Sequence, residues 1–320
     1  MHLDNALALK HNISMNSLPT ADRIRVIAAL VEGNSIRSVS RMTGVARNTI
    51  AAVLVEAGAA CAEYQDKALR NLTVKRVQCD EIWSFCYAKD KNLPEDKRQV
   101  FGYGSVWTWT AVDADTKLIC SWMVGNRDGY AAREFIQDLA GRLSNRVQLT
   151  TDGHGAYLEA IGEAFGNDID YAQLIKLYGE DRTGEARYSP PQCTGIKVHT
   201  ITGHPEWKHI STSYVERQNL TMRMQMRRFT RLTNGFSKKL ENHIAAVSLH
   251  FMHYNFVRIH QTLKITPAMA AGVTDKLWEI GDIVALIDER RSARHAEVLD
   301  SLAQSLRSGP WASITYAILR

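Results

Sequence analysis

Residues 75–88 read KRVQCDEIWSFCYA, and their β-branched and aromatic side chains predict a strand. Two stretches of similar composition follow at 100–112 and 118–125. The short Asp-rich segment 113–116 between them is typical of a tight turn that closes a hairpin. The region therefore predicts the start of a β-sheet with an antiparallel hairpin.

Downstream of the hairpin, hydrophobic periodicity predicts alternating helices and strands. The expected elements are a helix at 130–143, a strand at 147–151, a helix at 156–165, a strand at 171–177 and helices at 213–232 and 238–256. This order predicts an α/β fold with a mixed five-stranded sheet flanked by helices. A loop insertion rich in Pro and Gly is expected at about 178–212, and loops of that length tend to be functional.

Residues 21–58 predict three short helices separated by glycine-containing turns, which is the outline of a helix-turn-helix. In that motif the last helix enters the major groove, so Arg47, Asn48 and Thr49 are candidate DNA contacts. A helical bundle that binds no nucleic acid has the same pattern. The remaining expected divisions are a flexible arm at 1–20, a linker helix at 59–74, a larger domain at 75–275 and a C-terminal helical tail at 276–320.

The charge distribution indicates a polyanionic partner. The chain of 320 residues carries 39 basic and 34 acidic side chains, a net charge of +5. The segment 217–239 has no acidic residue but contains Arg217, Arg223, Arg227, Arg228, Arg231, Lys238 and Lys239. Such clustered positive charge favours binding to nucleic-acid phosphates.

Composition excludes several other classes of protein. The chain contains no run of eighteen apolar residues, so no membrane-spanning helix is predicted, and the polar N-terminus does not resemble a secretory signal. The five cysteines are scattered, which argues against a disulfide framework or a zinc site. We therefore expect a reduced, cytoplasmic protein with no membrane partner.

Three acidic residues stand in settings that need explanation. Asp80 lies inside the first strand, where an aspartate is unfavourable unless it is paired or bound to a metal. Asp152 follows the fourth strand, at a position where sheet folds present functional groups, although a turn aspartate fits equally well. Glu216 falls in the first turn of the basic helix, where the helix dipole favours a carboxylate.

The basic helix is expected to aim several polar groups in one direction. Glu216, Asn219, Arg223 and Arg227 have offsets of 0, +3, +7 and +11 and so share a helical face. Carboxylates from separate elements, with arginines nearby, suit phosphoryl transfer on a polynucleotide assisted by two divalent cations. Oxygen ligands favour Mg²⁺ or Mn²⁺ over zinc.

Three segments around these acids resemble the catalytic segments of DDE transposases, most closely those of the insertion-sequence-one family. They read CDEIWSF, TTDGHGAY and SYVERQNLTMRMQMRRFTRLTNGFSKKLENH, and the later YNFVRIHQTLKITPAMAAGV resembles the tail of integrase-like cores. The resemblance spans about residues 20–275. It implies a catalytic core similar to ribonuclease H and retroviral integrases.

The resemblance also implies roles for individual residues. Asp80, Asp152 and Glu216 would be both catalytic residues and metal ligands, and Asn219 and Arg223 would contact DNA ends. It assigns the first ligand to Asp80, a choice that the strand pattern alone leaves open because the neighbouring Glu81 is also acidic.

The implied function is that of an insertion-sequence transposase which binds element ends and catalyses metal-dependent phosphodiester hydrolysis and strand transfer. The expected partners are double-stranded DNA and further copies of the chain, in a prokaryotic cytoplasm and on the nucleoid when DNA is bound. The predicted DNA contacts are Arg47, Asn48, Thr49, Asn219, Arg223, Arg227, Arg228, Arg231, Lys238 and Lys239. The alternatives are a helix-turn-helix transcriptional regulator and a ribonuclease-H-like nuclease without strand transfer.

Overall fold

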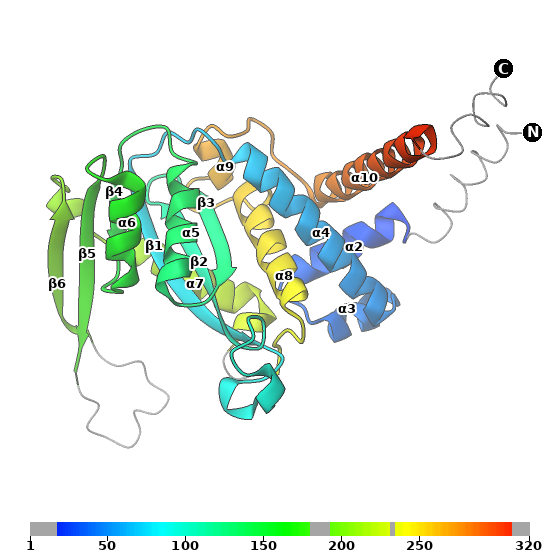
Figure 1. Cartoon of the computed structure of the whole chain (residues 1–320), viewed down its shortest axis with the longest axis horizontal. Coiled ribbons are helices and arrows are strands. Elements are labelled where there is room, and N and C mark those ends of the chain that lie inside the picture. Colours follow the sequence, from blue (N-terminus) through cyan, green and yellow to red (C-terminus); the bar gives the residue numbers. More distant parts are fainter. Residues whose placement is uncertain (1–17, 180–192, 231–233, 309–320) are drawn as a thin grey trace, which may run out of the picture.

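The computed structural model describes residues 18–179, 193–230 and 234–308, so most of the predicted arm at 1–20 lies outside the described residues. A mixed six-stranded sheet in the order β3-β2-β1-β4-β5-β6 dominates one half of the molecule (Figure 1). The strands are β1 Arg76–Cys86, β2 Gly104–Asp113, β3 Ile119–Gly125, β4 Gln148–Thr151, β5 Asp170–Tyr178 and β6 Cys193–Thr202. β1, β2 and β3 are antiparallel neighbours, β1, β4 and β5 are parallel, and β6 is antiparallel to β5.

The first five strands have the order and directions of a ribonuclease-H-like sheet, as predicted. The sixth strand corrects the expected five-stranded sheet, because β6 lies within the stretch 178–212 that was predicted to be a loop. Most of the residues of β6 are exposed and none is buried, so the strand shows no apolar alternation that could reveal it. It forms the edge of the sheet beside β5 (Figure 1).

Helices cover the two faces of the sheet. α5 Gly129–Ala140 and α6 Ala156–Phe165 pack on one face, where the buried indole of Trp109 contacts Phe135 and Tyr157 with ring centroids 5.8 and 5.4 Å apart. α7 Ser213–Gln225 packs against β1 and β2. Short 3-10 turns occur at Asp90–Asn92 (η1), Glu95–Lys97 (η2), Trp207–His209 (η4) and Arg227–Phe229 (η5).

The edge formed by β3 is covered by α8 Leu240–Met252 and the π-helical turn His253–Val257 that continues it. The Asn255 side chain accepts a hydrogen bond from the Ile119 N–H and donates one to the Ile119 carbonyl, both at 3.0 Å. An amide side chain thus takes the place of a neighbouring strand. This contact satisfies backbone groups that an edge strand would otherwise leave unpaired.

The N-terminal helices are α2 Thr20–Val31, α3 Ile36–Thr43 and α4 Arg47–Ala68. α3 ends at Gly44, whose φ of 74° is left-handed, and α4 leaves at 114° to it, within the range of helix-turn-helix motifs. Within the described ranges no single helix is long and apolar enough to span a bilayer, although the bent pair α3 and α4 meets that test when the two are combined.

α4 is one continuous helix, which differs from the separate linker helix expected at 59–74. Gly58 does not break the helix but provides a close approach to α8. A Cβ at this position would lie 2.4 Å from the Ala245 Cα, and the Ser248 hydroxyl donates a 2.7 Å hydrogen bond to the Gly58 carbonyl. The glycine is therefore a packing residue and not a helix terminator.

The predicted C-terminal tail contains α10 Ile280–Ser308, which follows the short α9 Pro267–Ala270 and packs beside α2 and α4 (Figure 1). Among its described side chains, those of Ile283, Val284 and Ile287 are buried. The buried Arg23 of α2 donates to Asp288 of α10 at 2.6 Å. The first half of α10 thus completes the N-terminal helical core.

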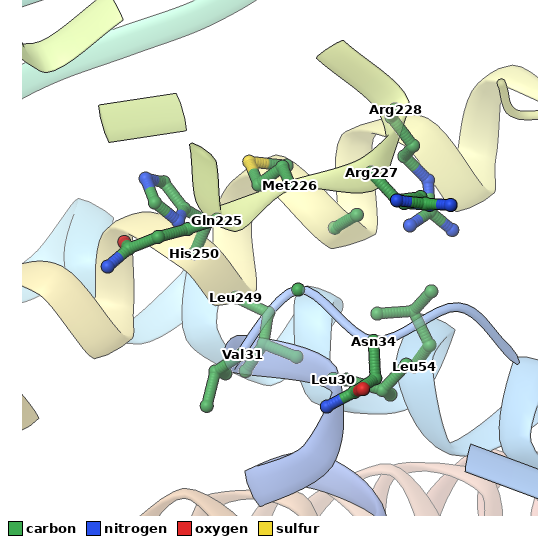
Figure 2. Close-up of a pocket in the computed structure, with 12 residues that line it drawn as sticks. Leu30, Val31, Asn34, Leu54, Gln225, Met226, Arg227, Arg228, Leu249 and His250 are labelled. Atoms are coloured by element: carbon green, nitrogen blue, oxygen red, sulfur yellow. The ribbon is translucent and has the colours of Figure 1, made fainter. Parts of the chain in front are cut away.

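The N-terminal helices meet the rest of the protein at a small cavity of about 30 Å³ (Figure 2). Asn34, in the turn after α2, and Gln225 and Met226, at the end of α7, line opposite sides of this cavity. Gly33 has a φ of 79°, and a Cβ there would lie 2.7 Å from the Gln225 carbonyl oxygen. The turn between α2 and α3 therefore packs directly against the end of α7.

Candidate active site

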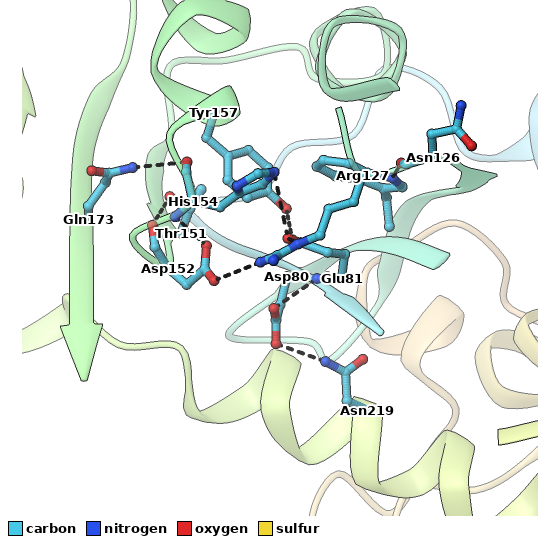
Figure 3. Close-up of polar contacts among 11 residues, drawn as sticks. Asp80, Glu81, Asn126, Arg127, Thr151, Asp152, His154, Tyr157, Gln173 and Asn219 are labelled. Carbon is cyan, nitrogen blue, oxygen red and sulfur yellow. Dashed lines mark hydrogen bonds and ion pairs between the residues drawn. The ribbon is translucent and has the colours of Figure 1, made fainter. Parts of the chain in front are cut away.

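Asp80 lies in β1, and Asp152 is the first residue after β4, the parallel neighbour of β1. The last residues of β1 and β4 that pair with each other are Cys79 and Thr151. Asp80 follows Cys79 and Asp152 follows Thr151, so the two aspartates come next to each other. Adjacent strands are about 4.8 Å apart, and residues in register on parallel strands share a face. The fold thus brings these two predicted site residues together (Figure 3).

Asp80 is held by two hydrogen bonds and surrounded by negative charge. The Glu81 N–H donates to its Oδ1 and the Asn219 side-chain amide to its Oδ2, both at 2.8 Å. Burial, followed by the charges of Glu81, Asp152 and Glu216, raises the pKa of Asp80 to about 7 against the opposing backbone hydrogen bond. A cation near Asp80 would stabilise its charged form.

Glu81 points to the other face of β1 and its side chain is fully buried. The Tyr157 hydroxyl donates to its carboxylate at 2.9 Å and the Arg127 Nε at 2.6 Å (Figure 3). The Arg127 guanidinium also lies 4.8 Å from the centroid of the Trp107 ring and 3.9 Å from the Asp152 carboxylate. Arg127 therefore links the buried Glu81 to the predicted ligand Asp152.

Sequence reasoning missed both partners of Glu81. Arg127 follows β3 in a polar turn and Tyr157 lies on an amphipathic helix, and neither setting is unusual in a sequence. The only sequence signal was Glu81 itself, since an acid in a predicted strand needs a positively charged or hydrogen-bonding partner.

Glu216 lies in the first turn of α7, and its charge contributes to the raised pKa of Asp80. Its carboxylate accepts hydrogen bonds at 2.6 Å from the Lys176 ammonium of β5 and from the Thr212 hydroxyl. Among the described residues, no group of three or more His, Cys, Asp or Glu side chains is arranged to hold one metal ion. The ion pair with Lys176, which the sequence did not reveal, places a positive charge against the Glu216 carboxylate.

The donor chemistry fits a hard divalent cation. The three predicted ligands offer carboxylate oxygens, and oxygen ligands suit Mg²⁺ or Mn²⁺. Beside them the Asn219 side-chain oxygen is buried and has no hydrogen-bond partner within the described part of the chain. Asp80 and Asp152 are placed as neighbours, whereas the Glu216 carboxylate is paired with Lys176.

The predicted shared face of the basic helix holds in part. Asn219 is 5% exposed and is bound to Asp80, so its side chain orients a carboxylate. Arg223 is half-buried on the same helix. Arg227 does not lie on this face, because α7 ends at Gln225 and the chain turns into η5. The buried side chains of Met226 and Phe229 account for this turn, since both pack into the core.

The other predicted DNA contacts differ in exposure. Arg47 and Asn48 are exposed and Thr49 is half-buried at the start of α4, and Lys238 and Lys239 are exposed before α8. Arg228 turns inward, where its Nε donates to the Ser237 hydroxyl at 2.6 Å and burial lowers its pKa to about 10. Arg231 lies outside the described residues.

Residues 102–180, about a quarter of the chain, match a family model described as a DDE domain, of the IS240 transposase type. This segment runs from β2 to β5 and includes Asp152, whereas Asp80 and Glu216 lie outside it. A comparison with curated protein sequences gives no match.

Among solved structures, the chain is similar to a cryo-EM structure of the piggyBac transposase synaptic complex with hairpin DNA. The two share 10% sequence identity with a TM-score of 0.38, over 85% of this chain and 72% of the other. The DDE-domain match supports the resemblance to DDE-type insertion-sequence transposases that the three acidic segments predict, while the finer likeness to the insertion-sequence-one family stays a prediction.

Proposed function

We propose that this protein is the DNA transposase of an insertion sequence and that it catalyses phosphodiester hydrolysis and strand transfer. One arrangement carries the proposal: Asp80 in β1 lies next to Asp152, which directly follows β4, and α7 hydrogen-bonds to Asp80 through Asn219 and carries Glu216 one turn earlier. The DDE-domain match, which contains Asp152, supports transposition in general.

In this proposal Asp80, Asp152 and Glu216 hold Mg²⁺ or Mn²⁺. Bound divalent cations would supply activation of the attacking oxygen and stabilisation of charge on the leaving oxygen. The chain's own residues prepare the carboxylates: the Asn219 amide orients Asp80, and Arg127 lies beside Asp152. Lys176 must release Glu216, and its freed ammonium group can then pair with a DNA phosphate.

The DNA would lie across the basic surface of the protein. Arg47 and Asn48 at the exposed start of α4 are suited to contacts with base edges or phosphates of the element end. Arg227, Lys238 and Lys239 are exposed and suited to neutralising phosphates. A homo-oligomer that brings two element ends together belongs to the same proposal.

The test is a cleavage and joining assay with purified protein, Mg²⁺ and labelled duplexes that carry the sequences on either side of the gene. Asp80→Asn, Asp152→Asn and Glu216→Gln are each expected to reduce nicking and joining about a thousandfold, because metal-assisted catalysis supplies several kcal/mol. Glu159→Gln is the matched control, since this glutamate pairs with Arg133 on the surface of α6.

Each outcome separates the alternatives. Full strand transfer by any of the three site variants would show that the assigned carboxylates are wrong. Nicking without joined product would favour a nuclease without strand transfer. Specific DNA binding with neither product in Mg²⁺ or Mn²⁺, and unaffected by Asp152→Asn, would favour a transcriptional regulator.

A further inference from the structure

α7 has a second polar face opposite the one that carries the candidate active site. Tyr214, Arg217, Gln218 and Thr221 have offsets of 0, +3, +4 and +7 and so lie along one side of the helix. At 3.6 residues per turn, this side is rotated by about 180° from the side of Glu216 and Asn219. The contacts around Asp80 leave this second face unexplained.

A cavity of about 360 Å³ lies against this second face. Its other walls are Lys117, from the turn between β2 and β3, and the segment that follows the π-helical turn of α8, from Arg258 to Thr262. Three cationic side chains line the cavity, Lys117, Arg217 and Arg258, and none of its described lining residues is acidic. Arg217 and Arg258 are both exposed, so they are accessible to a large ligand.

One residue that lines the cavity also has a buried hydrogen-bond donor without an acceptor. Gln218 is 3% exposed, and its side-chain nitrogen has no hydrogen-bond partner among the described residues. Lys117 is positioned by the Tyr214 ring, whose centroid lies 3.4 Å from its ammonium nitrogen, and by a hydrogen bond to the Ala114 carbonyl. An unsatisfied buried amide is unfavourable, so an acceptor oxygen at this place would be stabilised.

We propose that this cavity binds a backbone phosphate of duplex DNA, on the side of α7 away from the catalytic carboxylates. A phosphate offers acceptor oxygens to the Gln218 amide and negative charge to Arg217, Arg258 and Lys117. Because a helix with its side chains is about 10–12 Å wide, the bound phosphate is not the one that reacts. The inference rests on the proposed function, since it takes DNA to be the ligand.

The experiment measures DNA affinity by fluorescence anisotropy, with the full chain, a labelled duplex of arbitrary sequence, EDTA and a series of salt concentrations. The test variant is Arg217→Gln/Arg258→Gln. The control is Arg290→Gln/Arg294→Gln, which removes the same charge from α10, where Arg290 pairs with Glu63.

The test variant is expected to bind about tenfold more weakly, and the slope of log affinity against log salt should fall by about 0.9, the value for one lost phosphate contact. The DNA affinity of the control should stay within about twofold of that of the unchanged protein, because the control loses the same net charge but no contact with DNA. Gln218→Met keeps the side-chain volume and removes the donor, so it should also weaken binding, by about fivefold to tenfold.

Two failures are distinguishable. If the unchanged protein does not bind duplex DNA at all, the proposed function itself fails. If it binds and the test variant matches the control in affinity and in salt slope, the cavity does not take a DNA phosphate, and binding of free inorganic phosphate there would not rescue the proposal. Thermal denaturation of each variant checks folding, and the exposed positions of Arg217 and Arg258 make both replacements compatible with the fold.

Discussion

Replacement of Arg127 by Met tests whether the buried Glu81 depends on this arginine for its charge. The Glu81 side chain has no exposed area, and its carboxylate is bound by the Arg127 Nε and by the Tyr157 hydroxyl. Removing one partner of a buried ion pair costs about 3–5 kcal/mol, because the other charge is left unpaired. Arg127 is 39% exposed and the Tyr157 hydrogen bond remains, so screening reduces the expected loss of unfolding free energy to about 2 kcal/mol.

A double-mutant cycle isolates the pair. In a Glu81→Gln background the neutral amide no longer needs a cation, so Arg127→Met should then cost only about 0.5–1 kcal/mol. The difference gives a coupling energy of about 1–1.5 kcal/mol. Arg133→Met is the matched control, because Arg133 is also 39% exposed but its partner Glu159 is 64% exposed, and surface pairs contribute about 0–1 kcal/mol.

The measurement is urea denaturation in EDTA, followed by tryptophan fluorescence, for the four proteins of the cycle and the control. If Arg127→Met lowers the free energy of unfolding no more than Arg133→Met does, the buried carboxylate does not need its arginine. A coupling energy below about 0.5 kcal/mol would lead to the same conclusion, since that is the usual error of additivity.

Two further predictions concern stability. Gly58→Ala should lower the free energy of unfolding by about 1–3 kcal/mol in the same urea assay, because the new methyl group overpacks the contact with α8 despite the better helix propensity of alanine. Gly162→Ala in α6 should raise the free energy of unfolding by about 0.5–1 kcal/mol, because the space around its Cβ is open. Burial lowers the pKa of His243 and of His250 to about 3, so both stay neutral in the fold, whereas in the unfolded chain they become protonated near pH 6.5. The contribution to stability should therefore be complete above that pH, and the free energy of unfolding should fall by about 1.4 kcal/mol per pH unit per histidine on acidification. If urea titrations of His250→Gln give the same slope of unfolding free energy against pH as the unchanged protein, this prediction is wrong.

The sequence predicts most of the fold where apolar periodicity is strong. β1 to β5 lie where the predicted strands were expected, because each has at least one face in the core. β6 was missed because it has no buried side chain, and α7 was predicted too long because Met226 and Phe229 continue an apolar stripe across a real turn. Gly58 resembled a boundary in sequence, although α8 packs against it. The periodicity of apolar residues shows which residues are buried, but it does not show where the chain turns between them.

The candidate site was predictable to a smaller extent. Asp80, Asp152 and Glu216 stood out as candidates because carboxylates in a strand, at a strand end and on a basic helix are unusual, and their roles stay a prediction. Their counter-charges did not stand out, since Arg127 and Lys176 come from β-strand ends distant in sequence. Ion pairs of this kind depend on which strands are neighbours, and the order of strands is a property of tertiary structure.

The continuity of α4 has a geometric consequence for the exposed start of the helix. Because α8 packs tightly against α4 around Gly58, Arg47 is joined to the rest of the protein by a continuous helix and not by a flexible linker. One residue inserted within the first turns would rotate everything ahead of it by about 100° and advance it by about 1.5 Å. Because α2 also packs against α10 and the turn between α2 and α3 packs against the end of α7, such an insertion would break both contacts, so the fold fixes the length of the first turns of α4.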